Sequence, residues 1–452
     1  MSKIDLHKIK KVHFIGIGGI GISALARMMA LEGKEVTAND LDEFEMVTTL
    51  RQFGINTTIG TNISDVPVDA ELIVYSVAWD TIAPKLLKAV RERGVPLLSY
   101  AEVLGLISEQ KFTIAIAGSH GKTTTTAMVA HILIEAGLDP TVIVGSVFRD
   151  PRNGAKSNFI AGKSKYFVVE ACEYKRSFLN IHPNIAIVTN IDDDHLDYYK
   201  NLEGVQQGFK EFLGQIKKGG TVVTDIEGEK IVPVLEQSEK FLNEREIVSL
   251  DYLSLEQADG HGKISLKIPG EHNIKNAKAA LVVASVLGIP KEKAIESLAS
   301  FSGTWRRFEE KGKTKTGALV YDDYGHHPSE ITATLRGARD KFPGQKIVVA
   351  FQPHLYSRTR EHFDEFGPAL GLADEILILP IYAAREPADP EVTSEILTEK
   401  VQKVLDSKKT ANFFADFELA AEHLKNNLKS GDVFFTMGAG DVGKIAEMVL
   451  EG

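Results

Sequence analysis

The stretch 117–126, Ala-Gly-Ser-His-Gly-Lys-Thr-Thr-Thr-Thr, constrains the fold of this chain more than any other. An apolar run at 112–117 leads into it and predicts a buried strand, and apolar residues at helical spacing follow it. This order favours a phosphate-binding loop, because glycines let backbone N–H groups approach phosphate and the helix N-terminus adds its positive dipole end. Lys122 would reach the terminal phosphates, and Thr123 would place its hydroxyl on Mg²⁺.

The loop departs from the usual pattern at one position. Ile116 stands where a longer phosphate loop has its first glycine, so this is a short Gly-x-x-Gly-Lys-Thr loop. The alternative is an ordinary strand–turn–helix junction with a solvated lysine, but four consecutive threonines are a poor start for a plain helix. We therefore predict an ATP site. Its candidate loop residues are Gly118, Ser119, His120, Gly121, Lys122, Thr123 and Thr124.

The composition narrows the class of protein. A chain of 452 residues predicts two to four domains, and 43% hydrophobic with 25% charged residues is typical of a globular protein. A net charge of −10 argues against non-specific binding to nucleic acid or to an anionic membrane. The single cysteine, Cys172, predicts a reducing compartment, and no apolar run is long enough to span a membrane. The lysines and apolar residues near the N-terminus resemble a signal peptide, but four glycines favour a nucleotide-type βα turn, so we expect a cytoplasmic protein.

A second glycine-rich turn lies near the N-terminus. A predicted strand at 12–17 runs into Gly-Ile-Gly-Gly-Ile-Gly at 16–21, and a strand at 35–38 ends beside Asp40. Alone, this pattern indicates NAD-type binding with the acidic residue on a ribose hydroxyl, although any nucleotide diphosphate would satisfy it. The alternative is that the glycines only allow tight strand–helix packing. With Ser76, after a third predicted strand, the candidate substrate-binding residues here are Gly18, Gly19, Ile20, Gly21, Ser23, Asp40 and Ser76.

Acidic residues follow two predicted strands beyond the phosphate loop. The strand at 166–169 ends at Glu170, and a carboxylate in this place is the usual second anchor of Mg²⁺. The strand at 185–189 leads into three aspartates and His195, which we predict to lie near the metal or the phosphates. The alternatives are a solvated acidic loop and aspartates that cap the following helix. The candidate metal ligands are Thr123, Glu170 and His195.

Polar residues also open a helix near 270–276. His272, Asn273 and Asn276 are spaced to lie together on its first turn, where amides could hydrogen-bond an adenine edge. The alternative is a role as helix caps.

The last third of the chain repeats the βα pattern, with predicted strands at 319–321, 347–351, 375–379 and 432–437. Histidines and arginines follow these strands at their carboxyl ends, where ligands bind in open parallel sheets; plain surface placement is the alternative. We predict an α/β protein with three domains. They are a Rossmann-like domain at 1–106, a central P-loop ATPase-type domain at 107–304 and a Rossmann-like domain at 305–452.

Taken together, these motifs resemble the Mur ligase family over essentially the whole chain. The resemblance rests on residues 16–21, 118–123, 190–197, 272–276, 306–309, 322–328, 352–354 and 438–441. It implies that the first domain binds UDP-N-acetylmuramate, not NAD, and that ATP drives attachment of L-alanine. It also implies an acyl phosphate intermediate, with ADP and phosphate released, in peptidoglycan precursor synthesis.

The resemblance assigns further roles by position. Lys122 would neutralise the β- and γ-phosphates, Thr123 and Glu170 would hold one Mg²⁺, and His195 would hold a second. The remaining implied contacts are His272, Asn273 and Asn276 near adenine; Arg307 on the γ-phosphate when the third domain closes; Asp322 or Asp323 on the nucleotide; and His326 or His327, together with Arg358, at the amino acid. Lys122, His195, Arg307 and His327 are the candidate catalytic residues.

Two positions depart from the family pattern. Cys172 replaces an acidic residue in the run Glu-Ala-Asp-Glu, and Leu355 replaces an arginine after Gln-Pro-His. We hypothesise that Arg385 compensates for the missing arginine near the amino-acid carboxylate.

Three alternatives stay open at this point. A related Mur ligase could attach another amino acid or a recycled peptide to UDP-N-acetylmuramate. An NAD-dependent oxidoreductase would use only the first glycine turn, and a non-catalytic nucleotide-binding module would use neither Lys122 nor Glu170 for chemistry. We expect small-molecule partners only, no nucleic acid, no membrane insertion, and a monomer or homodimer.

Overall fold

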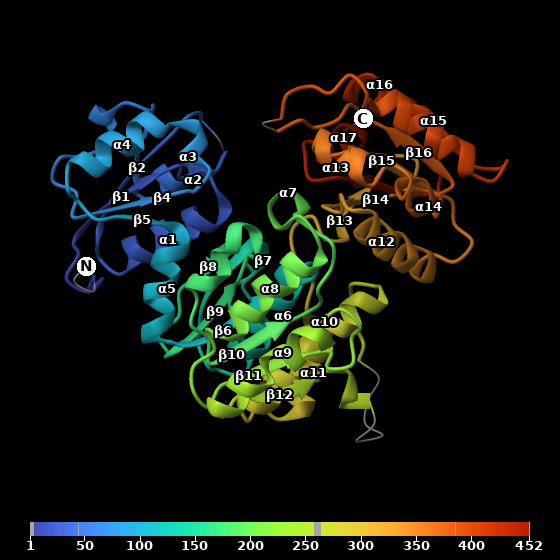
Figure 1. Cartoon of the computed structure of the whole chain (residues 1–452). Coiled ribbons are helices and arrows are strands. Elements are labelled where there is room, and N and C mark those ends of the chain that lie inside the picture. The colour runs from blue at the N-terminus through green and yellow to red at the C-terminus, as the bar shows by residue number, and fades with distance from the viewer. Residues whose placement is uncertain (1–3, 44, 257–263, 385, 452) are drawn as a thin grey trace. The chain divides into compact units, whose positions relative to one another are not determined.

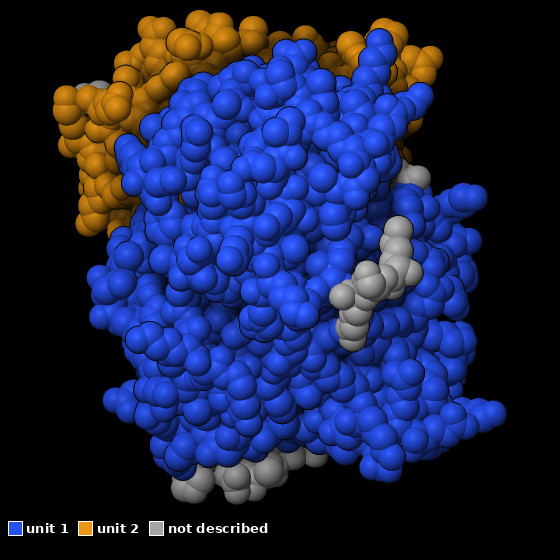
Figure 2. All heavy atoms as spheres, turned by 90° about the vertical axis from the view of Figure 1, so that its left-hand side faces the viewer, with its two compact units in different colours: residues 1–265, 275–301 blue, residues 266–274, 302–452 orange. Residues whose placement is uncertain are grey.

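The computed structural model describes residues 4–43, 45–256, 264–384 and 386–451. It contains three β-sheets, each built mainly from parallel strands and covered by helices (Figure 1). The chain groups into two compact units, residues 1–265 with 275–301 and residues 266–274 with 302–452, which Figure 2 colours separately. The predicted α/β class with three parallel-sheet domains is confirmed.

The first sheet has the strand order β3-β2-β1-β4-β5, with all neighbours parallel. Its strands are β1 (Lys11–Ile15), β2 (Glu35–Asp40), β3 (Asn56–Ile59), β4 (Leu72–Tyr75) and β5 (Leu97–Ser99). Its helices are α1 (Ile20–Leu31), α2 (Glu45–Gln52), the 3₁₀ helix η1 (Ile63–Asp65), α3 (Trp79–Ile82), α4 (Pro84–Glu92) and α5 (Tyr100–Gln110). Helix α3 follows β4 after a short connection at 76–78.

The second sheet has the order β12-β11-β10-β6-β9-β7-β8, in which only the β7–β8 pair is antiparallel. Its strands are β6 (Phe112–Ala117), β7 (Thr141–Arg149), β8 (Lys156–Ile160), β9 (Tyr166–Glu170), β10 (Ile185–Val188), β11 (Thr221–Thr224) and β12 (Val248–Asp251). Its helices are α6 (Lys122–Glu135), η2 (Tyr174–Asn180), α7 (Leu196–Tyr199), α8 (Leu202–Leu213), α9 (Val232–Glu244), η3 (Leu253–Glu256), α10 (Glu271–Val286) and α11 (Lys291–Ser300). Strand β6 lies between β9 and β10, so the loop that follows it emerges at the middle of the sheet.

The third sheet has the order β13-β14-β18-β15-β16-β17, with β13 antiparallel to β14. Its strands are β13 (Glu309–Lys313), β14 (Leu319–Asp323), β15 (Ile347–Phe351), β16 (Glu375–Ile378), β17 (Thr410–Phe413) and β18 (Val433–Met437). Its helices are α12 (Pro328–Lys341), α13 (Tyr356–Glu361), α14 (Phe366–Leu370), α15 (Ser394–Val404), α16 (Phe417–Asn427) and α17 (Gly443–Glu451). Two separate apolar clusters, one with α12, α14 and α15 and one with α16 and α17, cover the two faces of this sheet.

The first two sheets belong to one unit because helix α1 packs against the β7–β8 hairpin. The buried Asn158 side chain on β8 donates to the Ile20 carbonyl at the start of α1 (2.5 Å) and accepts from the Arg27 guanidinium. Arg27 also donates to Ser157 at 3.2 Å. These contacts tie the N-terminal glycine turn to the second sheet.

Among the described residues, no helix combines the length and the apolar character needed to cross a membrane.

Candidate active site

The phosphate loop lies between β6 and α6, as predicted, and two of its glycines have left-handed backbones. Gly118 has a φ of +134°, and a Cβ there would lie 2.0 Å from Thr189 Oγ1. Gly121 has a φ of +82° directly before α6, and a Cβ there would lie 2.6 Å from Asn276 Oδ1. Only glycine fits both the backbone conformation and the space.

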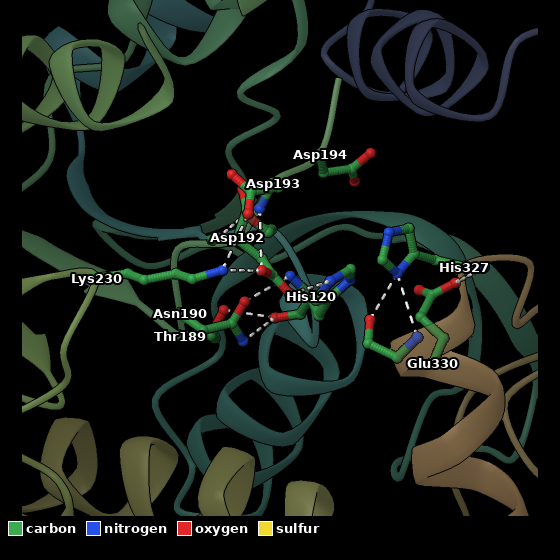
Figure 3. A network of polar contacts seen from close by, with 12 residues as sticks. His120, Thr189, Asn190, Asp192, Asp193, Asp194, Lys230, His327 and Glu330 are labelled. Atoms are coloured by element: carbon green, nitrogen blue, oxygen red, sulfur yellow. Dashed lines mark hydrogen bonds and ion pairs between the residues drawn. The ribbon is translucent and has the colours of Figure 1, made fainter. Parts of the chain in front are cut away.

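The chain that leaves β10 holds this loop in place. Thr189 Oγ1 and Asn190 Nδ2 donate to the His120 carbonyl at 2.6 and 2.9 Å, while Asn190 Oδ1 accepts from the His120 N–H at 2.9 Å. The Ser119 hydroxyl accepts from the Asp192 N–H at 2.8 Å. Figure 3 shows Thr189 and Asn190 against the loop at His120. The loop is therefore preorganised by hydrogen bonds within the middle domain.

Asp192 is the centre of a second group of polar contacts next to the loop. Its carboxylate lies 3.4 Å from His120 Nε2 and accepts a hydrogen bond from Lys230, which also reaches Asp193 at 3.3 Å (Figure 3). Hydrogen bonds from His120 and then Lys230 lower the pKa of Asp192 below its usual value. Lys230 was not predicted, because no motif marks it; only the fold brings it to this acidic segment.

Lys122 is held inside the loop by three acceptors. Its ammonium donates to the carbonyls of Gly118 (2.5 Å) and Ser119 (3.0 Å) and to Glu173 Oε1 (2.8 Å). Burial opposes the charged form, but nearby carboxylates, Glu173 first, raise the pKa of Lys122 above its usual value. The lysine is a permanent cation at the place where the terminal phosphates of a nucleotide would bind.

Thr123 and Glu170 meet as predicted for a metal site. The Thr123 hydroxyl donates to Glu170 Oε2 at 2.9 Å, and the same oxygen accepts from the Gly145 N–H at 2.8 Å. A hydroxyl and a carboxylate oxygen side by side are donors that Mg²⁺ prefers. These residues fit a magnesium ion, although their role as its ligands stays a prediction.

A second group of possible ligands lies near His195. Ligand atoms of Glu173, Asp194 and His195 all lie within 4.8 Å of one another. The His195 ring packs against Tyr174, with centroids 4.7 Å apart, and its backbone is left-handed with a φ of 56°. Sequence reasoning placed His195 near a metal but missed Glu173, which follows the exposed Cys172.

The first turn of α10 separates the three residues predicted to contact adenine. The Asn276 amide lies against Gly121 of the phosphate loop. Asn273 Nδ2 donates to the Pro269 carbonyl at 2.6 Å. Burial, and then the nearby Arg307 charge, lower the pKa of His272 to about 4. Asn276 is thus next to the loop, while the adenine contacts stay predictions.

The N-terminal glycine turn brings most of its predicted residues together. Asp40 Oδ2 accepts from the Gly18 N–H at 2.6 Å, so the end of β2 fixes the start of the turn. A Cβ on Gly21 would lie 2.7 Å from the Tyr100 hydroxyl. The Ser76 N–H donates to the Ile15 carbonyl at 3.0 Å, which places it after β4 beside β1.

Ser23 does not share this position. Its hydroxyl is fully buried, donates to the Ile20 carbonyl at 2.8 Å, and lies 3.4 Å from Asn158 Nδ2. The Ser23 side chain therefore faces the α1–β8 contact, and this geometry gives no support to its predicted substrate contact. Gly19 and Ile20, in contrast, lie at the turn itself, at the N-terminus of α1.

The segment around Arg306 and Arg307 is anchored by two buried aspartates of β14. Asp322 accepts from Arg306 Nε at 2.8 Å and from Thr436 Oγ1 at 2.7 Å. Asp323 accepts from the Phe308 N–H at 2.8 Å. Asp322 is 2% exposed, and its carboxylate is bound to Arg306. Its predicted contact with the nucleotide stays a prediction.

The Arg307 guanidinium is placed by its neighbours in the same unit. It lies 3.3 Å from Glu330 Oε1 and 5.4 Å from the centroid of the Tyr324 ring. Arg306 and Phe308, on either side of it, both have left-handed backbones, with φ of 54° and 51°. Such strained residues persist only where the surrounding contacts fix them, which is common at functional sites.

Histidines of the C-terminal unit gather at the carboxyl ends of its strands. His327 caps α12: its Nδ1 accepts from the Ser329 N–H at 3.3 Å (Figure 3). Arg358 Nη1 lies 3.0 Å from His354 Nδ1, and the His354 ring stacks on Tyr382 with centroids 5.7 Å apart.

His326 belongs to the same cluster of side chains as His354 and Arg358. Its ring centroid lies 5.7 Å from that of His354, and its Nδ1 lies 3.1 Å from the Tyr324 carbonyl. Burial lowers the pKa of His326. The fold thus brings His326 and Arg358 to the same group, whereas Arg385 lies outside the described residues.

Three family models together match most of the chain. Residues 11–112 match the family described as "Mur ligase family, catalytic domain", residues 116–284 match "Mur ligase middle domain", and residues 306–440 match "Mur ligase, glutamate ligase domain".

Individual proteins match over their full length. The chain is 39% identical over 468 residues to a UDP-N-acetylmuramate–L-alanine ligase of Caldanaerobacter subterraneus subsp. tengcongensis, with 99% of each chain covered. It is 40% identical over 460 residues to the enzyme of the same name from Clostridium acetobutylicum, covering 98% of this chain and 97% of that one.

Solved structures have the same fold. The UDP-N-acetylmuramate-alanine ligase of Thermotoga maritima superposes with a TM-score of 0.78 at 28% identity, covering 98% of both chains. A murein peptide ligase of Psychrobacter arcticus gives 0.70 at 23% identity, again with 98% of both chains covered, and this second likeness concerns the fold alone.

Proposed function

This chain belongs to the Mur ligase family, and from that membership we propose that it joins L-alanine to the carboxylate of UDP-N-acetylmuramate. The reaction converts ATP to ADP and phosphate and supplies a precursor of peptidoglycan. The observation that carries this proposal is the full-length identity of about 40% to ligases of that name. The oxidoreductase alternative is set aside, because the first glycine turn lies in a Mur ligase domain.

The three domains predicted from the sequence divide the substrates between them in this proposal. Residues 1–106 bind UDP-N-acetylmuramate, residues 107–304 bind ATP, and residues 305–452 bind the amino acid. The Gly18 N–H, held by Asp40, belongs to the turn that receives the diphosphate.

The chemistry begins with transfer of the γ-phosphoryl group to the substrate carboxylate, which gives an acyl phosphate. Lys122 stabilises the negative charge that develops on the transferred group, because a fixed cation at this point needs no reorganisation. Thr123 and Glu170 would hold a divalent ion, which would supply further charge neutralisation when bound. The hydrogen-bonded loop at Gly118 and His120 keeps the phosphates in position.

The second step is attack of the amino-acid amine on the acyl phosphate, which expels phosphate. Arg358 is proposed to bind the amino-acid carboxylate, and its contact with His354 supports this role because it fixes the guanidinium. Burial, followed by the charges of His326 and Arg358, lowers the pKa of His354 to about 3, so His354 stays neutral and adds no competing charge.

Phosphate release tests the proposal directly. Full-length protein with ATP, Mg²⁺ and UDP-N-acetylmuramate should release phosphate only after L-alanine is added. L-serine, glycine and the tripeptide L-alanyl-γ-D-glutamyl-meso-diaminopimelate form parallel arms, because Leu355 replaces the family arginine. Turnover with the tripeptide alone would replace the L-alanine assignment, and no turnover with any acceptor would refute the ligase proposal.

Variants of Thr123 provide the matched control for this assay. Thr123→Ser keeps the hydroxyl that meets Glu170, while Thr123→Val keeps the shape and removes it. We expect Thr123→Val to lower the rate about 100-fold and Thr123→Ser to lower it less than tenfold, consistent with the loss of one charge-stabilising group.

A further inference from the structure

Glu173 is a buried carboxylate to which neither the sequence motifs nor the proposed reaction gives a role. Its side chain is 2% exposed. Oε1 accepts from Lys122 at 2.8 Å, and Oε2 is buried without a hydrogen-bond partner among the described residues. The Glu173 carbonyl accepts from the Tyr199 hydroxyl at 2.5 Å, so the backbone is fixed as well. A carboxylate in this setting needs a cation beside it.

Lys122 supplies that cation in this structure, and it has no donor to spare. An ammonium group has three N–H donors, and here they reach Glu173 and the carbonyls of Gly118 and Ser119. To bind a β- or γ-phosphate, the ammonium must exchange some of these acceptors for phosphate oxygens. Glu173 then loses its counter-ion while it remains buried.

A replacement position exists beside the same carboxylate oxygen that pairs with Lys122. His195 Nε2 lies 3.7 Å from Glu173 Oε1, and Asp194 completes a group of ligand atoms within 4.8 Å of one another. Two carboxylates and an imidazole suit a divalent cation. The ring of Tyr174 packs on His195, and Lys175, next in the chain, has a left-handed backbone with a φ of 50°. Strain of this kind is retained where a side chain must be held for function.

We propose that Glu173 exchanges one cation for another when nucleotide binds. Without nucleotide its counter-ion is the Lys122 ammonium; with nucleotide, Lys122 turns to the phosphates and a divalent cation on Glu173, Asp194 and His195 replaces it. Nucleotide draws Lys122 away from Glu173, and the cation then neutralises the carboxylate in its place. Nucleotide and this cation therefore favour each other's binding. The inference rests on the proposed function only in that ATP binds at this loop.

Binding measurements on the nucleotide-free and nucleotide-bound full-length protein test the exchange without any turnover. Mn²⁺ binding is followed by electron paramagnetic resonance, and adenylyl imidodiphosphate replaces ATP. Glu173→Gln removes the charge at nearly constant shape. In the presence of EDTA, we expect this variant to bind nucleotide about tenfold more tightly. With nucleotide and Mn²⁺ present, we expect the Mn²⁺ at the Glu173, Asp194 and His195 position to bind at least tenfold more weakly, within the usual range of coupling between sites.

Lys122→Met gives the reciprocal result if the exchange operates. Without nucleotide, Glu173 is then free of its ion pair, and we expect Mn²⁺ to bind about tenfold more tightly than in the unmodified chain. A purely structural role of Glu173 would not increase metal affinity in this variant. Glu211→Gln is the control, because it removes a carboxylate that pairs with Arg176 and has no contact with Lys122 in the proposed exchange.

Each of the following results decides whether the exchange operates. An unchanged Mn²⁺ affinity in Lys122→Met overturns the exchange, as does an unchanged nucleotide affinity or an unchanged second Mn²⁺ in Glu173→Gln. Should Glu173→Gln fail to fold, Lys122→Met alone decides. Absence of phosphate release in the ligase assay leaves these binding results intact, so failure of the proposed function and failure of this inference are distinguishable.

Discussion

Two glycines of the middle domain share a backbone conformation and differ only in what surrounds them. Gly121, before α6, and Gly137, after it, both have a φ of +82°. A Cβ on Gly121 would meet the Asn276 amide at 2.6 Å, whereas a Cβ on Gly137 would meet nothing within 4 Å. The pair therefore separates backbone strain from crowding at the phosphate loop.

We expect Gly121→Ala and Gly137→Ala each to lower the free energy of unfolding by about 1–2 kcal/mol, the penalty of a left-handed non-glycine residue. Only Gly121→Ala should weaken adenylyl imidodiphosphate binding, by more than tenfold, because only its methyl group displaces Asn276. Urea unfolding and calorimetric titration measure the two effects. Equal nucleotide affinities in the two variants would contradict the steric account.

Single residues also show how far sequence reasoning reaches. Lys122, Thr123 and Glu170 could be predicted, because each follows a buried strand at a fixed offset and the carboxyl ends of neighbouring parallel strands meet. Glu173 and Lys230 could not, since their positions depend on left-handed residues after β9 and on the packing of a distant segment. No periodicity in the sequence encodes either contact.

At the scale of secondary-structure elements, the strands that could be predicted from the sequence are the buried strands in the middle of each sheet. The predictions for β6 and β15 agree with their observed bounds because each is a compact apolar run. The strands β3, β12, β13 and β17 were missed. They lie at sheet edges, where a strand buries few side chains and its alternation is weak. The antiparallel β7–β8 hairpin was missed as well, although it forms the contact with α1.

That contact depends on Asn158, which is 1% exposed. Asn158→Ala leaves the half-buried Arg27 guanidinium without one of its acceptors and removes one of the donors to the Ile20 carbonyl. We expect the free energy of unfolding to fall by about 2–3 kcal/mol and the KM for UDP-N-acetylmuramate to rise, because Ile20 belongs to the glycine turn. Asn153→Ala on the exposed turn between the same two strands is the control; equal losses in both variants would contradict the role of Asn158.

At the scale of the whole molecule, the chain forms two units although it has three sheets. The domain number could be predicted from the repeated βα pattern, but the grouping of the first two domains could not, because it rests on α1 packing against strands that sequence reasoning missed. Each unit also carries one of the two tryptophans, Trp79 and Trp305. Unfolding of the units can therefore be followed separately.

Asp323 makes the stability of the C-terminal unit depend on pH. Burial raises its pKa to about 6, against the opposing effects of Arg307 and two backbone N–H groups. As pH rises from about 4 to 6, the unfolded chain releases this proton before the folded unit does, so stability falls; above pH 6 the loss is constant. Between pH 7.5 and pH 5 the difference is roughly 1–2 kcal/mol.

The check compares the unmodified Asp323 with Asp323→Asn in a Trp79→Phe background, where Trp305 reports on its own unit. We expect the parent to gain roughly 1–2 kcal/mol relative to Asp323→Asn when the pH falls from 7.5 to 5. A parent that gains nothing relative to the asparagine variant would show that Asp323 titrates normally.

The exposed Cys172 has a practical consequence. It is the only thiol in the chain, and it lies between Glu170 and Glu173 at the end of β9. Burial, and then the Glu173 charge, raise the pKa of this thiol, so a maleimide dye would label this one defined position slowly and best at alkaline pH, with no cysteine to remove first. Its emission would report occupancy of the phosphate loop in the unmodified sequence, which makes this protein suitable for screening ligands by fluorescence.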